Sequence, residues 1–348
     1  MGFFGNIFHP PHAESIIFIH VSAGSVAGAY AQYKKNKTPA LLYTRRVAID
    51  IRDGEPQERA LQHALEILGS FLIREGAPVL ARYSGSGSAD TIFVSVDAPW
   101  QETKVHTEHF ERETPFTFTK KMVTAALEKT TIVPQGKLLA NESVVGTSLN
   151  GYHVREPYGK NVHRASATIF TSFIDATISK IIAETIQHLF HTKNILSIAG
   201  TSLRYQAIRT MFPHEHHALM LDTMGPLISI ALVRKDFLTA VEEVSDVNKG
   251  SNTDIWIKKI MDEFVKLAEQ YPLPRTIFLL AQEPEISSLE QALEAAKLGG
   301  LWLSDNPPKV VPILASHIVG AVRQVTTDPP DLPLLLMALY WQHRSKEN

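Results

Sequence analysis

The segment IIFIHVSAGSVAGAYAQY, residues 16–33, places an apolar stretch on each side of a short turn of Gly and Ser. The segment HALMLDTMGPLISIALV, residues 217–233, repeats this pattern in the second half of the chain. Each segment is predicted to form two apolar strands joined by a turn. Because such turns can offer backbone N–H groups to a phosphate, the repeat predicts a duplicated, two-lobed α/β protein with a cleft between its lobes.

The length and composition are those of an ordinary globular protein. A chain of 348 residues exceeds what one hydrophobic core usually serves, so two or more domains are expected. With 20% charged residues and a formal net charge of −2, the chain has no overall field to attract nucleic acid, and no nucleic-acid partner is predicted. The absence of Cys excludes disulfides, thiolate metal sites and cysteine nucleophiles, and it agrees with a cytoplasmic location.

No apolar run approaches the ~20 residues that span a bilayer, and no basic segment precedes an apolar core at the N-terminus. The chain is therefore expected to be neither exported nor membrane-spanning. The N-terminal stretch would form one apolar face if it became helical, through Phe3, Phe4, Ile7 and Phe8. Residues 3–8 are either a segment of a tail that ends at Pro10 and Pro11 or an element that touches a membrane.

Strand and helix signals in the N-terminal region of the chain predict a meander followed by a crossover. The three strands of the meander are predicted at 15–22, 26–33 and 39–51. A helix over 56–76 has leucines at helical spacing and is expected to end at Gly76, before Pro78. It leads to a strand at 91–96, predicted to be parallel to one of the first three. The segment SGSGSAD, residues 84–90, is predicted to be a hairpin turn.

The remaining signals predict an inserted α+β domain and a second lobe. The domain contains a helix over 119–130 and ends in a helix over 171–190. Later elements are predicted as strands at 194–200, 236–246, 276–281 and 310–314 and helices at 202–212, 253–270, 287–299 and 332–342. The predicted regions are an N-terminal tail (1–14), a first lobe formed by two separate segments (15–99 and 193–212), an inserted small domain between those segments (100–192), a second lobe (213–315) and a C-terminal segment with an apolar helix (316–348).

This order of elements resembles the actin-like ATPase fold in the branch of the cell-division protein FtsA and the pilus-assembly protein PilM, over roughly residues 15–315. The resemblance implies an α/β, two-lobed duplicated actin-like (ribonuclease H-like) fold with a small inserted α+β domain. In the family, the first hairpin reads like DIGSGSVK. The present HVSAGSVAG keeps Gly24, Ser25 and Val26, but His20 stands at the leading Asp and no Lys follows the turn.

The second family hairpin reads like VDIGGGTTD, and the present LMLDTMGPLIS keeps Asp222 and Gly225. Met224 and Pro226 hinder a close approach of the backbone to phosphate, because Met is bulky and Pro has no N–H. At the family's adenosine-binding Gly-Gly turn, the sequence has Gln282, Glu283 and Pro284 instead. The segment DVNKGSN also leaves no room for the family's fourth subdomain.

The resemblance implies a nucleotide site at two turns. Its candidate residues are Ser22, Gly24, Ser25, Asp222, Thr223 and Gly225. In active relatives the position of Asp222 helps to hold Mg²⁺, but a single carboxylate without a partner at position 20 binds Mg²⁺ poorly. The ordinary alternative is that these residues only make turns and caps. We expect that nucleotide binding is weakened or lost and that the protein has no cofactor, with ATP and Mg²⁺ as the alternative.

Other motifs carry weaker signals. The histidines of HEHH, residues 214–217, are interpreted as solvated loop residues, because neighbouring side chains in an extended segment point to opposite faces. In GTSLR, residues 200–204, Ser202 lacks the second Gly of a nucleophile elbow, so a hydrolase is not predicted. The apolar helix 332–342 is expected to pack on the first lobe, with membrane contact as the alternative.

The sequence thus predicts a scaffold protein of the FtsA/PilM type in the cytoplasm, beside the inner membrane, in cell division or type IV pilus assembly. It is expected to bind a protein partner through residues 100–192 and not to act as an enzyme. The alternatives are an active ATPase that switches or polymerises with nucleotide, and a structural protein whose fold has taken on another task.

Overall fold

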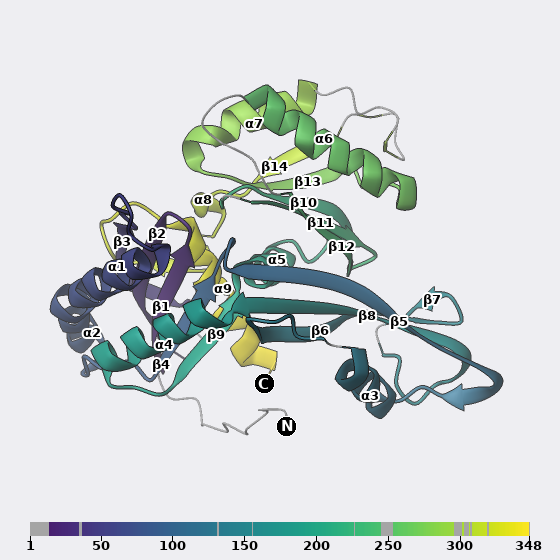
Figure 1. The fold of residues 1–348 in the computed structure, drawn as a ribbon, viewed down its shortest axis with the longest axis horizontal. Helices are drawn as coiled ribbons and strands as arrows, with labels where there is room; N and C mark the ends of the chain where they lie inside the picture. Colours follow the sequence, from purple (N-terminus) through teal and green to yellow (C-terminus); the bar gives the residue numbers. More distant parts are fainter. Residues whose placement is uncertain are drawn as a thin grey trace. The chain divides into compact units, whose positions relative to one another are not determined.

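The computed structural model describes most of the chain and divides it into two compact units (Figure 1). The described residues are 14–34, 37–130, 132–154, 156–225, 227–244, 253–295, 301–302, 306, 308–318 and 320–347. Unit 1 comprises Met1–Ser95, Ile181–Ser197 and Ala315–Asn348, and unit 2 comprises Val96–Lys180 and Ile198–Leu314. No described helix combines the length and the apolar character that crossing a bilayer requires. The N-terminal segment 3–8, a candidate for membrane contact, lies outside the described residues.

The first predicted hairpin forms the centre of the sheet in unit 1. Strands β1 (Glu14–Ser22) and β2 (Ser25–Tyr33) pair antiparallel and are buried along almost their whole length. Strand β3 (Ala40–Ala48) pairs with β2. Both faces of the hairpin are covered, which explains why its sequence is continuously apolar rather than alternating. The six-stranded sheet has the order β15-β3-β2-β1-β4-β9, with β4 at Thr91–Val96, β9 at Ile195–Ala199 and β15 at Arg323–Gln324.

The predicted end of the first helix at Gly76 is wrong. Helix α1 (Gln57–Phe71) continues through a π-helical turn, η1 (Leu72–Gly76), into α2 (Ala77–Ser84). A Cβ at Gly76 would lie 2.6 Å from the Tyr30 ring, so this glycine permits close packing and does not end a helix. Pro78 is accommodated in the first turn of α2. The helix ends at Gly85, whose φ of 85° is left-handed, so segment 84–90 is a helix cap leading to β4 and not a hairpin turn.

The C-terminal helix packs within unit 1, as predicted. Helix α9 (Leu332–Glu347) follows the short α8 (Ala315–Ile318), and it contacts β1 and β2. The Tyr33 hydroxyl donates a hydrogen bond to the Ala338 carbonyl (2.7 Å), and Trp341 Nε1 donates to Glu14 Oε2 (3.2 Å). Residues 334–339 are buried, which accounts for a helix that is apolar around most of its circumference.

A four-stranded antiparallel sheet with the order β5-β8-β6-β7 occupies the predicted inserted domain. Its elements are β5 (Gln101–Thr117), α3 (Lys120–Thr130), β6 (Lys137–Leu149), β7 (Tyr152–His153) and β8 (Asn161–Asp175). The predicted helix 171–190 begins later, because 171–175 complete β8. Helix α4 (Ala176–Phe190) is capped at its N-terminus by Asp175, whose Oδ1 accepts hydrogen bonds from the N–H groups of Thr177 and Ile178.

The second predicted hairpin forms the centre of another sheet, in unit 2. It follows α5 (Gly200–Met211) and consists of β10 (His217–Asp222) and β11 (Ile228–Arg234). The sheet has the order β12-β11-β10-β13-β14, and β10, β13 and β14 run parallel. Its other strands are β12 (Phe237–Val244), β13 (Thr276–Leu280) and β14 (Lys309–Pro312).

Helices α6 (Thr253–Gln270) and α7 (Glu283–Ala295) lie together on one face of this sheet (Figure 1). Their buried side chains, among them Phe264 and Leu293, form one core with the strands. The predicted start of α7 at Ser287 or Ser288 is wrong. The helix begins at Glu283, because Pro284 suits the first turn and Glu283 and Glu285 stabilise the helix N-terminus. The predicted closing glycines, 299 and 300, lie outside the described residues.

The two larger sheets share one strand order. In unit 1 the order β3-β2-β1-β4-β9 places the third, second, first, fourth and fifth strands side by side, and in unit 2 β12-β11-β10-β13-β14 does the same. The predicted duplicated α/β architecture is therefore confirmed. The compact units group residues 96–180, most of the predicted inserted domain, with residues 198–314.

Candidate functional site

The turn of the first hairpin, in unit 1, uses its hydroxyl groups internally. Ser22 Oγ donates to the Ser25 carbonyl (2.9 Å) and lies 3.2 Å from Ser25 Oγ. Arg46 Nη1 donates to Ser25 Oγ (2.6 Å), while its Nε and Nη2 bind both carboxylate oxygens of Asp331. A Cβ at Gly24 would meet nothing within 4 Å, so packing does not require that glycine. His20, at the position of the family's leading Asp, is 3% exposed.

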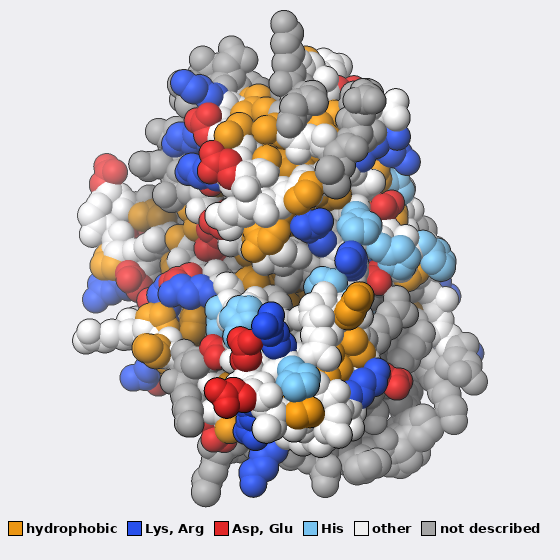
Figure 2. All heavy atoms as spheres, turned by 90° about the vertical axis from the view of Figure 1, so that its right-hand side faces the viewer, with side chains coloured by type: hydrophobic (Ala, Val, Ile, Leu, Met, Phe, Trp, Pro, Cys, Tyr) orange, Lys and Arg blue, Asp and Glu red, His pale blue; other side chains and the backbone are white. Residues whose placement is uncertain are grey.

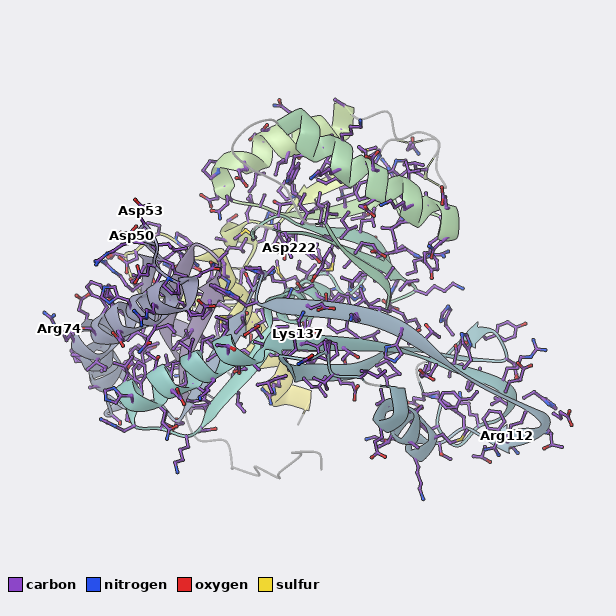
Figure 3. The ribbon with its side chains drawn as sticks, in the orientation of Figure 1. Asp50, Asp53, Arg74, Arg112, Lys137 and Asp222 are labelled. Atoms are coloured by element: carbon purple, nitrogen blue, oxygen red, sulfur yellow. The ribbon has the colours of Figure 1, made fainter. Side chains whose placement is uncertain are left out.

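In the turn of the second hairpin, in unit 2, the first two backbone N–H groups form hydrogen bonds within the protein. Asp222 ends β10 (Figure 3), and its Oδ1 accepts the N–H of Met224 (3.1 Å). The N–H of Thr223 donates to the carbonyl of Leu280 (2.8 Å), and the Thr223 hydroxyl donates to the same oxygen (3.0 Å). Pro226 lies outside the described residues. The N–H groups of residues 223 and 224 are thus already hydrogen-bonded within the protein.

A buried arginine joins the second turn to the residue that follows β4. Arg204, on α5, binds Asp222 through Nε and donates from Nη1 to Asp97 Oδ1 (2.8 Å) and Oδ2 (2.9 Å). The side chains are 7% exposed for Arg204, 2% for Asp97 and 10% for Asp222. Burial by itself lowers the pKa of Arg204, but the two carboxylates outweigh it and raise that pKa above its ordinary value. We call this cluster of Asp97, Arg204 and Asp222 the buried triad.

The start of α5 is shaped for this contact. At Gly200, the first residue of the helix, a Cβ would lie 1.7 Å from Asp97 Oδ1 and 3.0 Å from Arg204 Nη1. Only glycine leaves room for the carboxylate there. The backbone of α5 at Gly200 and the side chain of Asp97 therefore pack more closely than a larger residue at position 200 would allow.

A small polar cavity adjoins the buried triad. Its volume is about 10 Å³, enough for one water molecule. It is lined by Asp97, Ala98, Gln101, Thr201, Arg204, Asp222, Gly225, Leu227, Ser229 and Glu243. Gln101 Oε1 and Ser229 Oγ are buried and have no hydrogen-bond partner among the described residues, so a bound water suits this position. The cavity is too small for a nucleotide phosphate chain.

Polar side chains of β5 and β12 enclose this cavity. Gln101 Nε2 donates to Thr201 Oγ1 (2.8 Å) and to Glu243 Oε1 (3.1 Å), and Thr103 Oγ1 also donates to Glu243 Oε1 (3.0 Å). Burial raises the pKa of the Glu243 carboxyl; the hydrogen bond from Thr103 opposes this shift and the charge of Glu102 adds to it. Lys137, labelled in Figure 3, pairs with Glu102.

Asp97 and Arg204 were not among the residues predicted from the sequence. Asp97 follows the strand TIFVSV directly, and an acidic residue at the end of a buried strand could have indicated a candidate site residue. Arg204 lies within GTSLR, a motif that had indicated only an incomplete nucleophile elbow. Ser202 in that motif is fully buried and accepts hydrogen bonds from the amides of Asn141 (3.0 Å) and Gln206 (3.2 Å). These partners suit a structural hydroxyl and cannot serve as a general base.

Metal binding has little support in the described residues of the chain. No group of three or more His, Asp or Glu side chains among them could hold a metal ion. Asp222 Oδ2 binds Arg204 and Oδ1 accepts the N–H of Met224, so the Arg204 cation already lies against the carboxylate that would hold Mg²⁺. In HEHH, His216 Nδ1 lies 2.7 Å from Asp236 Oδ1. The roles of the six candidate nucleotide-binding residues stay predictions.

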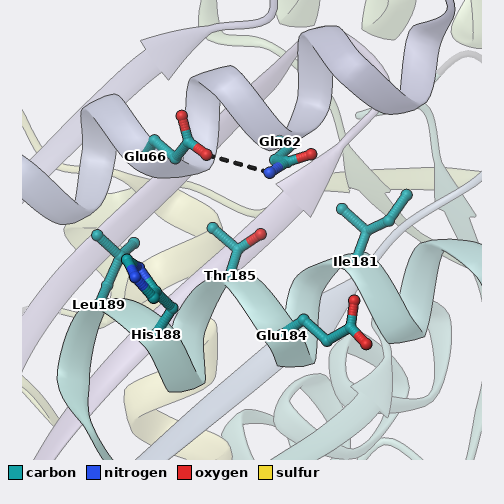
Figure 4. Close-up of a pocket in the computed structure, with 7 residues that line it drawn as sticks. All are labelled: Gln62, Glu66, Ile181, Glu184, Thr185, His188 and Leu189. Atoms are coloured by element: carbon teal, nitrogen blue, oxygen red, sulfur yellow. Dashed lines mark hydrogen bonds between the residues drawn. The ribbon is translucent and has the colours of Figure 1, made fainter.

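A separate surface groove lies between α1 and α4 in unit 1 (Figure 4). Its volume is about 160 Å³, and its lining residues are Gln62, Glu66, Ile181, Glu184, Thr185, His188 and Leu189. Gln62 Nε2 donates to Glu66 Oε1 across one helical turn (3.1 Å). The two helices approach closely here, because Gly69 of α1 faces the Leu189 side chain.

No protein-family model and no curated protein matches the sequence. Among solved structures, PilM in the PilM–PilN type IV pilus biogenesis complex is similar, with 11% identity, a TM-score of 0.53, and coverage of 96% of this chain and 99% of that chain. A Bacteroides thetaiotaomicron protein with an actin-like ATPase fold covers the same shares, at 8% identity and a TM-score of 0.48. An Aquifex aeolicus member of the Ppx/GppA family matches at 10% identity and a TM-score of 0.39, covering 97% of this chain and 90% of that chain.

The comparison with PilM and the strand order together define the class of fold. The chain has the actin-like ATPase fold, built from two sheets of the same strand order and a smaller antiparallel sheet. More particularly, it shares this fold over nearly its whole length with the pilus-assembly protein PilM.

Proposed function

We propose that this protein is an actin-like scaffold of the FtsA/PilM type that organises a membrane-associated assembly through protein contacts, with nucleotide binding weakened or lost. The assembly would be a cell-division or type IV pilus machine, and the protein would act in the cytoplasm beside the inner membrane. The similar fold of PilM, which is solved in complex with PilN, supports a role in binding a protein partner. The observation that carries the proposal is the buried triad.

The buried triad opposes nucleotide binding at the second turn. A phosphate needs unoccupied N–H donors, and Mg²⁺ at a carboxylate that already pairs with an arginine is repelled by that cation. Here Arg204 binds the carboxylate of Asp222, and the N–H groups of residues 223 and 224 donate hydrogen bonds to other groups of the protein. Withdrawing Arg204 to admit Mg²⁺ would leave Asp97, only 2% exposed, without its counter-charge. Breaking a buried ion pair in this way costs about 3–5 kcal/mol.

Exposed apolar side chains on the antiparallel sheet support a partner contact through residues 100–192. Ile132 is 81% exposed, and Val133, Leu138 and Leu139 are each more than 40% exposed. Single exposed apolar residues are common, but four within eight residues are a feature of binding surfaces. They precede or begin β6, which pairs with β8 on one side and with β7 only at Ser148 and Leu149. The side of β6 that β7 covers only at its end, with apolar side chains beside it, suits an extended partner segment.

The alternative is an active ATPase that switches or polymerises with nucleotide. The retained residues Gly24, Ser25, Asp222 and Gly225 favour it, because they match the family's phosphate-binding hairpins. In that case Arg204 would have to release Asp222 when ATP and Mg²⁺ bind.

Thermal unfolding with and without millimolar ATP and Mg²⁺ separates the two functions, because a ligand that binds only the folded state raises the midpoint. The scaffold proposal expects no shift. A rise of several degrees that disappears in Asp222→Asn would refute weakened nucleotide binding. Asp236→Asn is the matched control, because it also removes an aspartate from an ion pair with arginine, at the other end of the β10–β11 hairpin.

The partner contact is tested by replacing Ile132 and Leu138 with serine together. The double variant should fold normally and lose a partner that co-purifies with the wild-type protein from its native host. The matched control replaces Ile51 and Ile73, which are exposed apolar residues of unit 1, with serine. Loss of the partner only in the control, or equal loss in both variants, would argue against residues 100–192 as the binding region.

A further inference from the structure

The turn between β11 and β12 is held in an unfavourable backbone conformation. Lys235 and Asp236 have φ values of 50° and 73°, so both lie in the left-handed region. Two-residue turns of this kind favour Asn-Gly or Asp-Gly, because a lysine side chain is strained there by roughly 1 kcal/mol. Strained residues concentrate at binding sites, which makes this turn a candidate for binding a ligand.

The one carboxylate in the turn is already occupied. Asp236 Oδ1 lies 2.6 Å from Arg209 Nη2 and 2.7 Å from His216 Nδ1, and the N–H of Asp236 donates to the His216 carbonyl (3.1 Å). Arg234 and Lys235, which precede it, have no ion-pair partner among the residues that the structure describes. The turn therefore presents two unneutralised cations next to each other.

Two imidazoles share this positive environment. His217 lies opposite Arg234 in the β10–β11 ladder, and the His153 ring stacks on Phe237 with a centroid distance of 5.2 Å. Burial lowers the pKa of both histidines, and the charges of Arg234 and Lys235 lower it further. In the space-filling view, histidine side chains gather beside lysine and arginine side chains (Figure 2).

An exposed aromatic residue neighbours His153 in the chain. Tyr152 precedes His153 in β7 and is 78% exposed. We define the turn surface as His153, His217, Arg234 and Lys235. The other charged or titratable groups of the adjoining segments are Tyr152, Arg209, His214, Glu215, His216, Asp236 and Arg275, which precedes β13 beside His217. At neutral pH the arginines and Lys235 outnumber the two carboxylates, and protonation of the histidines adds further positive charge.

We infer that the turn surface binds an acidic segment of a partner protein, whose carboxylates meet Arg234 and Lys235. Charge complementarity selects this occupant. An anionic membrane is a poorer match, because membrane-binding clusters carry about 4–8 lysines and arginines. The inference rests on the proposed scaffold function and extends it, but it depends on different residues from the apolar surface at Ile132 and Leu138.

The test is fluorescence anisotropy of a labelled, glutamate-rich peptide, mixed with the full-length protein at low ionic strength. The wild-type protein should bind it, and added salt should weaken binding because exposed charges are screened. Replacing Arg234 and Lys235 with glutamine together should weaken binding roughly fivefold, as expected for losing two exposed ion pairs. Lys235→Gln keeps a Cβ at the left-handed position, so the backbone strain is unchanged.

The matched control replaces Lys120 and Lys121 on α3 with glutamine, which removes two adjacent exposed lysines from the same unit. This variant should bind like the wild type, and a peptide with glutamine in place of glutamate should not bind. Replacing Arg234 and Lys235 with glutamate should abolish binding of the acidic peptide and create binding of a lysine-rich peptide. Lowering the pH from about 7 to about 5 should tighten binding, because His153 and His217, whose pKa lies below the ordinary value of about 6.5, become cationic on acidification.

Failure of the wild-type protein to bind the acidic peptide, or equal weakening in the α3 control, would overturn the inference. Tighter binding to phosphatidylserine vesicles than to the peptide, lost in the Arg234/Lys235 variant, would assign the surface to a membrane and also overturn it. These outcomes are distinct from failure of the proposed function, because the Ile132/Leu138 variant leaves the turn surface intact.

Discussion

Replacing Arg204 with methionine tests the energetic role of the buried triad. Methionine keeps a long apolar side chain but removes the guanidinium, so the packing of α5 is retained while the charge is lost. In the wild-type protein Arg204 Nη1 lies 2.8 Å from Asp97 Oδ1, and Nε binds Asp222. The variant leaves two carboxylates buried side by side without a counter-charge.

The expected loss of stability is large. Removing one partner of a buried ion pair costs about 3–5 kcal/mol. Arg204 is 7% exposed and serves two carboxylates that are 2% and 10% exposed, so solvent screens this interaction little. For a unit of this size, each kcal/mol lowers the unfolding midpoint by about 2–4 °C, so a fall of roughly 10 °C is expected.

The loss should depend on pH in one direction. Without Arg204, two buried carboxylates carry negative charge with no counter-charge, which costs the folded variant free energy at neutral pH. Acid that neutralises carboxylates removes this cost. The difference from wild type should be greatest at neutral pH and shrink towards about pH 4.

Urea unfolding at several pH values, followed by circular dichroism, measures this difference. Arg209→Met is the matched control, because Arg209 lies on the same helix and pairs with Asp236, but both side chains are at least 20% exposed. That control should lose less than about 1 kcal/mol. A similarly small loss for Arg204→Met, or a large loss that does not change with pH, would refute the reasoning.

Two further changes test the surroundings of the buried triad. Gly200→Ala should destabilise unit 2 by about 1–3 kcal/mol, because its Cβ would lie 1.7 Å from Asp97 Oδ1, whereas Gly24→Ala, with nothing within 4 Å, should lose much less; urea unfolding measures both. Glu243→Gln should gain stability relative to wild type as the pH rises above about 4.3, because the raised folded pKa of Glu243 makes its ionised form unfavourable. Midpoints measured across pH check this, and a gain that is equal at all pH values would contradict it.

Much of the fold was predictable because its signals are local. The two hairpins are continuous apolar segments broken by a turn, and helix α6 was predicted with its observed limits, residues 253–270. The role of Gly76 was not predictable in this way. A glycine before a proline usually ends a helix, but here it fits against Tyr30, a residue distant in the chain. The start of α7 at Glu283 could have been predicted from Pro284, because proline is favourable in the first turn of a helix.

The sequence by itself determined the duplicated strand-turn-strand pattern, the absence of thiol chemistry and the lack of an N–H at position 226. These follow from residue types and from neighbours a few positions apart. Only the tertiary structure decided the use of Asp222, because its partner Arg204 and the second carboxylate, Asp97, come from separate segments. Burial makes a counter-charge necessary for each carboxylate, but the packing of α5 against Asp97 and the end of β10 determines which residue supplies it.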